Sequence, residues 1–262
     1  MAEQPDSQVI IGDPSLQRVV ARGATLTLGA SSDLVAQART LGARQSELAP
    51  VAAPALAATV RSRPAERRAL GADPGDTVVL TVTRLAPQKN LGLLLDIAAA
   101  VRDRVDLRFV VVGDGPLRAE LDHRVVTEGL RVAFHGSVDH VSDLLAAADL
   151  ALLTSTWEAR ALVAQEALLA GLPLVSTRVG GIEELVGDAA VLVSPDDVAG
   201  ISAGVADLAA DPVRRAELRA AGLRRAAGWP DEDQVARDLA ARYARLVAGA
   251  TAGHSTEGRR AT

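Results

Sequence analysis

Short apolar runs alternate with amphipathic segments along the chain from Thr77 onward. The segments between the runs carry apolar residues at i, i+3 and i+4, which predicts helices at 91–101, 117–126 and 161–169. The runs themselves are rich in Val and Leu and predict six strands, at 78–82, 107–112, 132–134, 150–153, 174–176 and 190–193. Strands alternating with helices imply right-handed crossovers and a parallel sheet covered on both faces. The sequence therefore predicts an α/β protein with a doubly wound, Rossmann-like parallel sheet.

The chain on either side of this alternation has a different pattern. After the sixth run only helical segments remain, at 198–208, at 213–227 and from Pro230 to about Val247. Residues 249–262 are rich in Gly, Ser, Thr and Ala and predict a disordered tail. Upstream, one strand is expected at 24–28 and one helix at 33–41, followed by a linker at 49–64. The expected division is thus 1–64, 65–248 and 249–262.

Composition excludes several classes of function. The net charge is −5 and 2% of residues are aromatic, so the chain offers neither a basic face nor stacking platforms for nucleic acid. No cysteine is present, which excludes disulfides and thiolate chemistry and is compatible with a cytoplasmic location. No apolar run approaches the roughly 20 residues of a membrane span, and no signal peptide is recognisable. The four histidines lack paired metal-ligand spacing, so we expect no metal site.

Polar and glycine-rich clusters follow the expected strands at their carboxyl ends. They comprise Arg84 and Lys89, residues 113–116, residues 135–137, residues 155–158, and Gly180 with Gly181. Ligands of open parallel sheets bind beyond the carboxyl ends of the strands, near the point where strand order reverses. Because every such cluster falls at this one edge, we expect the binding site there.

Arg84 and Lys89 place two cations on the loop after the first strand. Lys89 is the only lysine among 28 basic residues. Arginine can bind phosphate oxygens with two parallel hydrogen bonds, and lysine supplies a point charge. The loop is therefore predicted to hold a diphosphate, the alternative being a solvated loop with two ordinary charges.

Two acids, Glu158 and Glu166, flank the start of the helix expected from Arg160 onward. Free N–H groups in its first turn point toward the site and favour an anion. The acids lie about 12 Å apart if the intervening chain is helical, too far for an acid–base pair but suited to the two ends of an extended ligand. The alternatives are an exposed helix cap for Glu158 and a surface acid for Glu166, although an unpartnered carboxylate in the apolar context of Glu166 would be costly.

The glycine-rich stretch at 113–116 is not a dinucleotide-binding motif. It reads Gly-Asp-Gly-Pro, follows the second strand, and has Arg118 where the third glycine of that motif would stand. A tight turn explains it better. Gly180 and Gly181 are likewise assigned to a turn, with Glu183 and Glu184 beginning the next helix.

The order of these features resembles the donor-binding half of the retaining glycosyltransferases of group 1, also called family 4. The order is a strand, Glu158, a helix with Glu166, Gly-x-Pro at 171–173, a second strand, and Gly-Gly at 180–181. The family usually has Gly-Arg-x-x-x-x-Lys-Gly on the first loop. Here its Arg and Lys are present, but Thr83 and Asn90 replace the flanking glycines. The family's Glu-Gly-Phe-Gly reads Glu-Ala-Arg-Ala at 158–161.

This resemblance implies the GT-B architecture of two Rossmann-like domains facing a cleft. Residues 65–248 then form the nucleotide-sugar-binding domain, and 1–64 are a remnant of the amino-terminal acceptor domain plus a linker. The implied reaction transfers a sugar from a nucleoside diphosphate sugar to an acceptor hydroxyl with retention, without a cofactor or an obligatory metal. The acceptor is unknown. The 262-residue chain is expected to transfer the sugar slowly or not at all, and either to self-associate or to be a truncated form of a longer enzyme.

The resemblance also implies roles for individual residues. Glu158 lies by the donor sugar, Glu166 accepts hydrogen bonds from the ribose, and the backbone near Gly136 lies by the base. Arg84 and Lys89 stabilise the leaving diphosphate. Further donor contacts are expected from the start of the helix, at Arg160, Ala161, Leu162 and Val163. Two alternatives are a non-catalytic nucleotide-sugar-binding fragment that needs a partner domain and a sugar-nucleotide epimerase of the same fold; the spacing of Glu158 and Glu166 favours the transferase.

Overall fold

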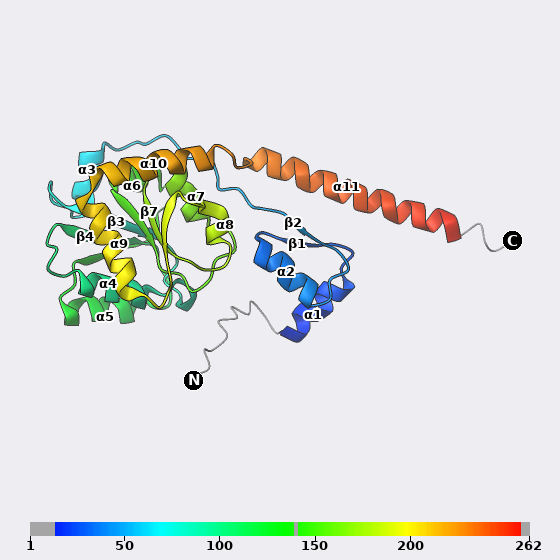
Figure 1. The fold of residues 1–262 in the computed structure, drawn as a ribbon, viewed down its shortest axis with the longest axis horizontal. Helices are drawn as coiled ribbons and strands as arrows, with labels where there is room; N and C mark the ends of the chain where they lie inside the picture. Colours follow the sequence, from blue (N-terminus) through cyan, green and yellow to red (C-terminus); the bar gives the residue numbers. More distant parts are fainter. Residues whose placement is uncertain (1–13, 139–140, 258–262) are drawn as a thin grey trace. The chain divides into compact units, whose positions relative to one another are not determined.

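The computed structural model describes residues 14–138 and 141–257 (Figure 1). Contacts divide these residues into two compact units. The larger unit contains residues 55–229 and the smaller one contains residues 14–54 together with 230–257.

The larger unit is built on a six-stranded, fully parallel sheet. Its strand order is β5-β4-β3-β6-β7-β8. The strands are β3 (Thr77–Val82), β4 (Leu107–Val112), β5 (Val132–His135), β6 (Leu150–Leu153), β7 (Leu174–Thr177) and β8 (Ala190–Val193). All six lie where apolar runs predict them, and the doubly wound parallel sheet is confirmed.

Successive side chains of each strand point alternately into two separate hydrophobic cores, one on each face of the sheet. In β3, Val78 and Leu80 pack into one core and Val79 packs into the other. Successive side chains of a strand point to opposite faces, so a strand buried on both faces must be apolar at nearly every position. This requirement explains why the strands read as continuous apolar runs.

Helices cover both faces of the sheet, and Figure 1 shows the two groups around the strands. One face carries α4 (Leu91–Ala100), α5 (Arg118–Glu128) and α9 (Val198–Ala210). The other carries α3 (Arg63–Ala69), α6 (Ser142–Ala147), α7 (Leu162–Leu169), α8 (Ile182–Val186) and α10 (Pro212–Ala226). The aspartates before α9 and α10 cap them: Asp197 and Asp211 accept hydrogen bonds from the backbone N–H groups of Gly200 and Arg214.

The smaller unit contains a two-stranded parallel sheet. Its elements are α1 (Pro14–Gly23), β1 (Thr27–Gly29), α2 (Ser32–Thr40), β2 (Ser46–Leu48) and α11 (Glu232–Glu257). The strand and helix expected at 24–28 and 33–41 are present, whereas α1 and β2 were not predicted. A three-residue strand such as Ser46–Leu48 is too short to show an alternation of apolar and polar residues, so the sequence pattern does not predict it.

Two expectations about the carboxyl-terminal part need correction. Helix α11 continues past Val247 to Glu257, so residues 249–257 are not a disordered tail; residues 258–262 lie outside the described part. Alanines at 248, 250 and 252 are strong helix formers and offset the neighbouring glycines. Helix α11 also groups with residues 14–54 rather than with the larger unit, because Arg242 bonds the carbonyl of Leu48 at 2.9 Å and pairs with Glu47 at 3.3 Å.

Candidate functional site

The strand order reverses between β3 and β6, at the centre of the six-stranded sheet. The chain leaves β3 toward β4 on one side and leaves β6 toward β7 on the other, so the loops at their carboxyl ends diverge. Arg84 and Lys89 follow β3, and Glu158 follows β6. The predicted site residues of these two loops therefore lie at the topological switch point.

Lys89 and Glu158, 69 residues apart in sequence, form an ion pair at this edge. The Lys89 Nζ lies 2.5 Å from Glu158 Oε1, and the Ser155 hydroxyl donates to the same oxygen at 2.7 Å. Glu158 is only 8% exposed. A buried carboxylate needs such charge-assisted partners, and this one has a cation and a hydroxyl fixed on one of its oxygens.

Hydrogen bonds between side chains and backbone carbonyls, with Gln88 donating from its side-chain amide, hold the loop after β3 to the loop after β6. Thr154 donates from its hydroxyl to the carbonyl of Lys89 at 2.9 Å, and the Gln88 amide donates to the carbonyl of Trp157 at 2.8 Å. Asn90 has φ 46° and ψ 50°, the only positive φ among non-glycine residues of the described chain. Asparagine tolerates this left-handed conformation better than other residues with a side chain, so it can replace the family's glycine here.

The 113–116 turn serves a second purpose that sequence reasoning did not find. Gly113 has φ 134°, and a Cβ added there would overlap the carbonyl oxygen of Thr83. A Cβ at Gly115 would lie 2.5 Å from the carbonyl oxygen of Leu85. These two glycines let the turn after β4 lie directly against the phosphate-binding loop predicted after β3.

Gly180 and Gly181 hold the backbone of Glu158. The N–H of Gly181 donates to the Glu158 carbonyl at 2.8 Å. Gly180 has φ 50°, and a Cβ there would overlap that same carbonyl and lie 2.9 Å from Trp157 Nε1. The turn expected at these residues is present, and it also fixes the position of Glu158.

A cavity of about 470 Å³ opens beside Arg84 at the same edge. It is lined by Val82, Thr83, Arg84, Val112, Gly113, Asp114, Ser137, Val138 and Val141. Gly136 is exposed and adjoins this lining. The sequence placed residues 113–116 and 135–137 at this edge but gave no individual role to Asp114 or Ser137, and it did not identify Val138. Their positions directly after β4 and β5 were the available signal.

Helix α7 begins at Leu162, one or two residues after the expected starts at 161 and Arg160, with Ala161 as its N-cap residue. Ala161 is buried, Leu162 is exposed and Val163 is half-buried. The chain from Glu158 to Ala161 is therefore not helical, and the 12 Å separation expected for two ends of one helix does not apply. The free N–H groups of the first turn of α7 therefore start at Leu162.

Arg160 lies over an aromatic ring. Its guanidinium carbon is 5.8 Å from the centre of the Trp229 ring. Burial is the largest influence on the pKa of Arg160 and lowers it, while Glu184 raises it and Arg225 lowers it. Such cation–π contacts are typically worth about 0.5 to 2 kcal/mol.

Glu166 is half-buried on α7, among apolar neighbours as the sequence suggested. Burial raises the pKa of its carboxyl above the ordinary value. Within residues 14–138 and 141–257 its side chain forms no hydrogen bond or ion pair. A carboxylate that pays for desolvation without a partner is a candidate ligand-binding group.

Lys89 and Glu158 are in direct contact, and Arg84 lines the neighbouring cavity. Among the described residues, Glu166 forms no hydrogen bond or ion pair with any of these three. Over the same residues no group of three or more His, Cys, Asp or Glu side chains is arranged to hold a metal ion. None of their helices is both long and apolar enough to cross a bilayer.

Residues 62–225 match the family model of glycosyl transferases group 1. The chain belongs to this family. It is 32% identical over 193 residues to the lipopolysaccharide core biosynthesis mannosyltransferase LpsB of Rhizobium meliloti (strain 1021), covering 69% of this chain and 55% of that protein. It is 34% identical over 203 residues to the D-inositol 3-phosphate glycosyltransferase of Geodermatophilus obscurus, covering 71% of this chain and 44% of that protein. The chain thus spans about half the length of these curated relatives.

Solved structures show the same fold. Anabaena Alr3699/HepE in complex with UDP superimposes with a TM-score of 0.80 at 23% identity, covering 90% of this chain and 69% of that one. The same protein in complex with UDP-glucose gives a TM-score of 0.77 at 23% identity, covering 88% of this chain and 68% of that one. The α/β architecture is therefore that of known GT-B glycosyltransferases.

Proposed function

We propose that the chain binds a nucleoside diphosphate sugar at the carboxyl edge of the six-stranded sheet and takes part in transfer of the sugar, with retention, to an acceptor hydroxyl. The observation that carries this proposal is the pairing of Lys89 with Glu158 at the switch point, beside the cavity that Arg84 lines. A cation for phosphate and an acid for sugar hydroxyls stand together where parallel sheets bind their ligands. The structure of a fold relative with UDP-glucose bound supports the donor class.

The chemistry assigned to these residues is electrostatic. Breaking the bond between the sugar and the diphosphate leaves negative charge on the phosphate oxygens. Arg84, Lys89 and the first N–H groups of α7 stabilise that charge, because donors fixed in advance need no reorganisation during the reaction. When the diphosphate binds, Lys89 shares its donors between phosphate and Glu158, and the second Glu158 oxygen remains available for a sugar hydroxyl.

Transfer also needs a surface that positions the acceptor hydroxyl and excludes water. We propose that the larger unit supplies donor binding and that this chain alone transfers slowly or not at all. The test is a transfer assay with this chain beside a version extended at its amino terminus, in the presence of a metal chelator. Proton NMR of the product reads the anomeric configuration. We expect faster transfer by the extended form, with the anomeric configuration retained in the product. An inverted product would refute retention, and full activity of this chain alone would refute the need for a further acceptor surface.

Replacing either cation of the predicted phosphate-binding loop should weaken diphosphate binding selectively. We expect Arg84→Ala and Lys89→Ala each to lose about 1.5 to 3 kcal/mol of nucleoside diphosphate affinity and to keep nucleoside affinity. Calorimetric titration measures both. Arg68→Ala, an exposed arginine on α3, is the matched control and should bind both ligands normally. Unchanged diphosphate binding in both loop variants would remove the assignment.

The Glu166→Gln variant should bind nucleotide more weakly without losing folding stability. The carboxylate is assigned to the ribose hydroxyls, so Glu166→Gln should weaken binding of a ribonucleoside diphosphate more than that of its dideoxy analogue. The raised pKa means that the folded state binds the proton more tightly than the unfolded state, so folding stability is lost as pH rises through that pKa. Glu166→Gln removes this loss, so its Tm at neutral pH should be equal or higher. A lower Tm with equal weakening of both ligands would indicate a packing role instead.

A further inference from the structure

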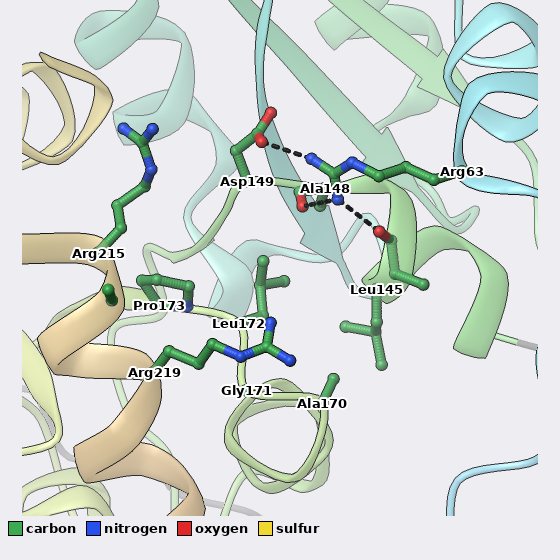
Figure 2. Close-up of a pocket in the computed structure, with 12 residues that line it drawn as sticks. Arg63, Leu145, Ala148, Asp149, Ala170, Gly171, Leu172, Pro173, Arg215 and Arg219 are labelled. Carbon is green, nitrogen blue, oxygen red and sulfur yellow. Dashed lines mark hydrogen bonds and ion pairs between the residues drawn. The ribbon is translucent and has the colours of Figure 1, made fainter. Parts of the chain in front are cut away.

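A second cavity lies at the opposite edge of the six-stranded sheet, where β6 and β7 begin (Figure 2). Its volume is about 450 Å³. The lining residues come from α3, α6, α10 and the segments leading into β6 and β7. None of the predicted donor-site residues lines it.

Three arginines and one acid line this amino-edge cavity, in a chain whose net charge is −5. The acid, Asp149, is already engaged: Arg63 contacts its Oδ1 at 2.5 Å, and Arg67 and the N–H of Val78 bond its Oδ2, each at 2.8 Å. Asp149 therefore does not neutralise the arginines that face it across the cavity. The cavity carries an excess of positive charge.

Arg219 is the cation left without a counterion. Its side chain extends from α10 across Gly171 toward the middle of the cavity (Figure 2). A Cβ at Gly171 would lie 3.0 Å from the Arg219 Cγ and 3.3 Å from its Cζ, so the glycine leaves room for this side chain. Within the described residues the guanidinium forms no hydrogen bond or ion pair. The Arg219 side chain is exposed, so its donors are accessible to a ligand in the cavity.

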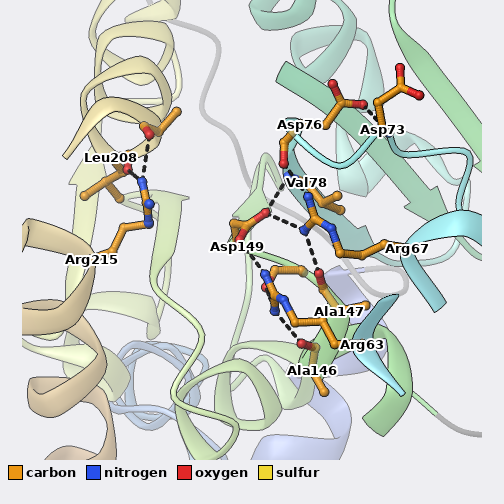
Figure 3. Close-up of polar contacts among 12 residues, drawn as sticks. Arg63, Arg67, Asp73, Asp76, Val78, Ala146, Ala147, Asp149, Leu208 and Arg215 are labelled. Carbon is orange, nitrogen blue, oxygen red and sulfur yellow. Dashed lines mark hydrogen bonds and ion pairs between the residues drawn. The ribbon is translucent and has the colours of Figure 1, made fainter. Parts of the chain in front are cut away.

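The other two arginines keep donors for a ligand as well. Arg215 uses Nη1 to bond the carbonyls of Leu208 and Ala209, at the end of α9, at 2.5 and 2.7 Å. Arg63 uses its two terminal nitrogens, toward Asp149 and the end of α6, as Figure 3 shows. A guanidinium has five N–H donors, so both retain unused ones. These anchoring bonds fix the two cations in place.

We propose that this amino-edge cavity binds a phosphate monoester, with Arg219 and Arg215 as its principal contacts. Arginine binds phosphate oxygens with paired hydrogen bonds, and the guanidinium of Arg215, already held by the carbonyls of Leu208 and Ala209, gives up little side-chain entropy on binding. Leu145, Leu172 and Pro173 form an apolar wall for the group that the phosphate esterifies. The proposal is independent of the donor site, which lies at the other edge of the sheet.

The test uses a background in which the proposed donor site is silenced by Arg84→Ala and Lys89→Ala. Glycerol phosphate is titrated while heteronuclear NMR follows the backbone signals of Gly171 and Leu172. We expect saturable shifts in this background, and Arg219→Ala should weaken the affinity about tenfold or more, the effect of losing one charge-assisted interaction. Arg224→Ala, an exposed arginine on the same helix outside the cavity, is the control and should leave the affinity unchanged.

A phosphate monoester reaches such a site either in solution or as a lipid headgroup. A second arm therefore measures sedimentation with phosphatidylcholine vesicles that carry phosphatidic acid. Binding of glycerol phosphate assigns a soluble ligand, and binding to vesicles alone assigns a lipid. Either result supports the site if Arg219→Ala weakens that binding about tenfold or more. Absence of both, or equal losses in Arg219→Ala and Arg224→Ala, would overturn the proposal.

Discussion

The Gly180→Ala variant should unfold at a temperature about 6 to 12 °C lower than the parent chain. Gly180 has φ 50°, and an added Cβ would overlap the carbonyl of Glu158 and press on the Trp157 ring nitrogen. A strained left-handed conformation and overpacking each cost about 1 to 3 kcal/mol, and a loss of about 3 kcal/mol corresponds to this shift in a domain of this size. Differential scanning calorimetry measures it.

The same variant should lose nucleoside diphosphate affinity, because moving the Glu158 backbone displaces the carboxylate from Lys89. Gly75→Ala is the matched control: Gly75 has no positive φ and nothing within 4 Å of an added Cβ. It should change the Tm by no more than about 1 to 2 °C. Equal Tm values for the two variants would show that the close approach at Gly180 is not needed.

The Asp149→Ala variant should lose about 3 kcal/mol of unfolding free energy. Asp149 accepts hydrogen bonds from Arg63, from Arg67 and from the N–H of Val78 at the start of β3, which ties α3 to the sheet (Figure 3). Removing one partner of a buried ion pair costs about 3 to 5 kcal/mol. Asp149 keeps 21% of its side chain exposed, so the lower end applies.

Denaturant titration of three variants tests this role. Asp149→Asn keeps one oxygen acceptor and should fall between Asp149→Ala and the parent chain. Asp122→Ala removes an exposed ion pair with Arg118 four residues away and should cost no more than about 0.5 kcal/mol. If Asp149→Ala were no worse than Asp122→Ala, the network around Asp149 would carry no stability.

The sheet could be predicted from the sequence because its strands are buried on both faces, which forces an apolar residue at nearly every position. Burial of Glu166 was also foreseen, because its neighbours on α7 are apolar, and the raised pKa agrees. Short elements were missed: α3 and β2 span seven and three residues, too few for a period to emerge.

The contacts that build the site were beyond prediction from local pattern. Lys89 and Glu158 were each identified, but their ion pair joins loops 69 residues apart, and only the strand order brings β3 beside β6. The roles of Gly113 and Gly180 depend on a carbonyl from another loop lying where a side chain would be. A turn after a strand is a common place for glycine, so the sequence explains why glycine occurs at these two positions. Only the tertiary structure shows why no other residue would fit.

The most direct test of the account is calorimetric titration of the 262-residue chain with a panel of nucleoside diphosphates, each beside its nucleoside. We predict saturable, one-to-one binding of at least one diphosphate and an affinity at least about tenfold above that of the matching nucleoside, since Arg84, Lys89 and the start of α7 are assigned to the phosphates. Absence of binding across the panel, or equal affinities of diphosphate and nucleoside, would contradict a donor site at this edge of the sheet.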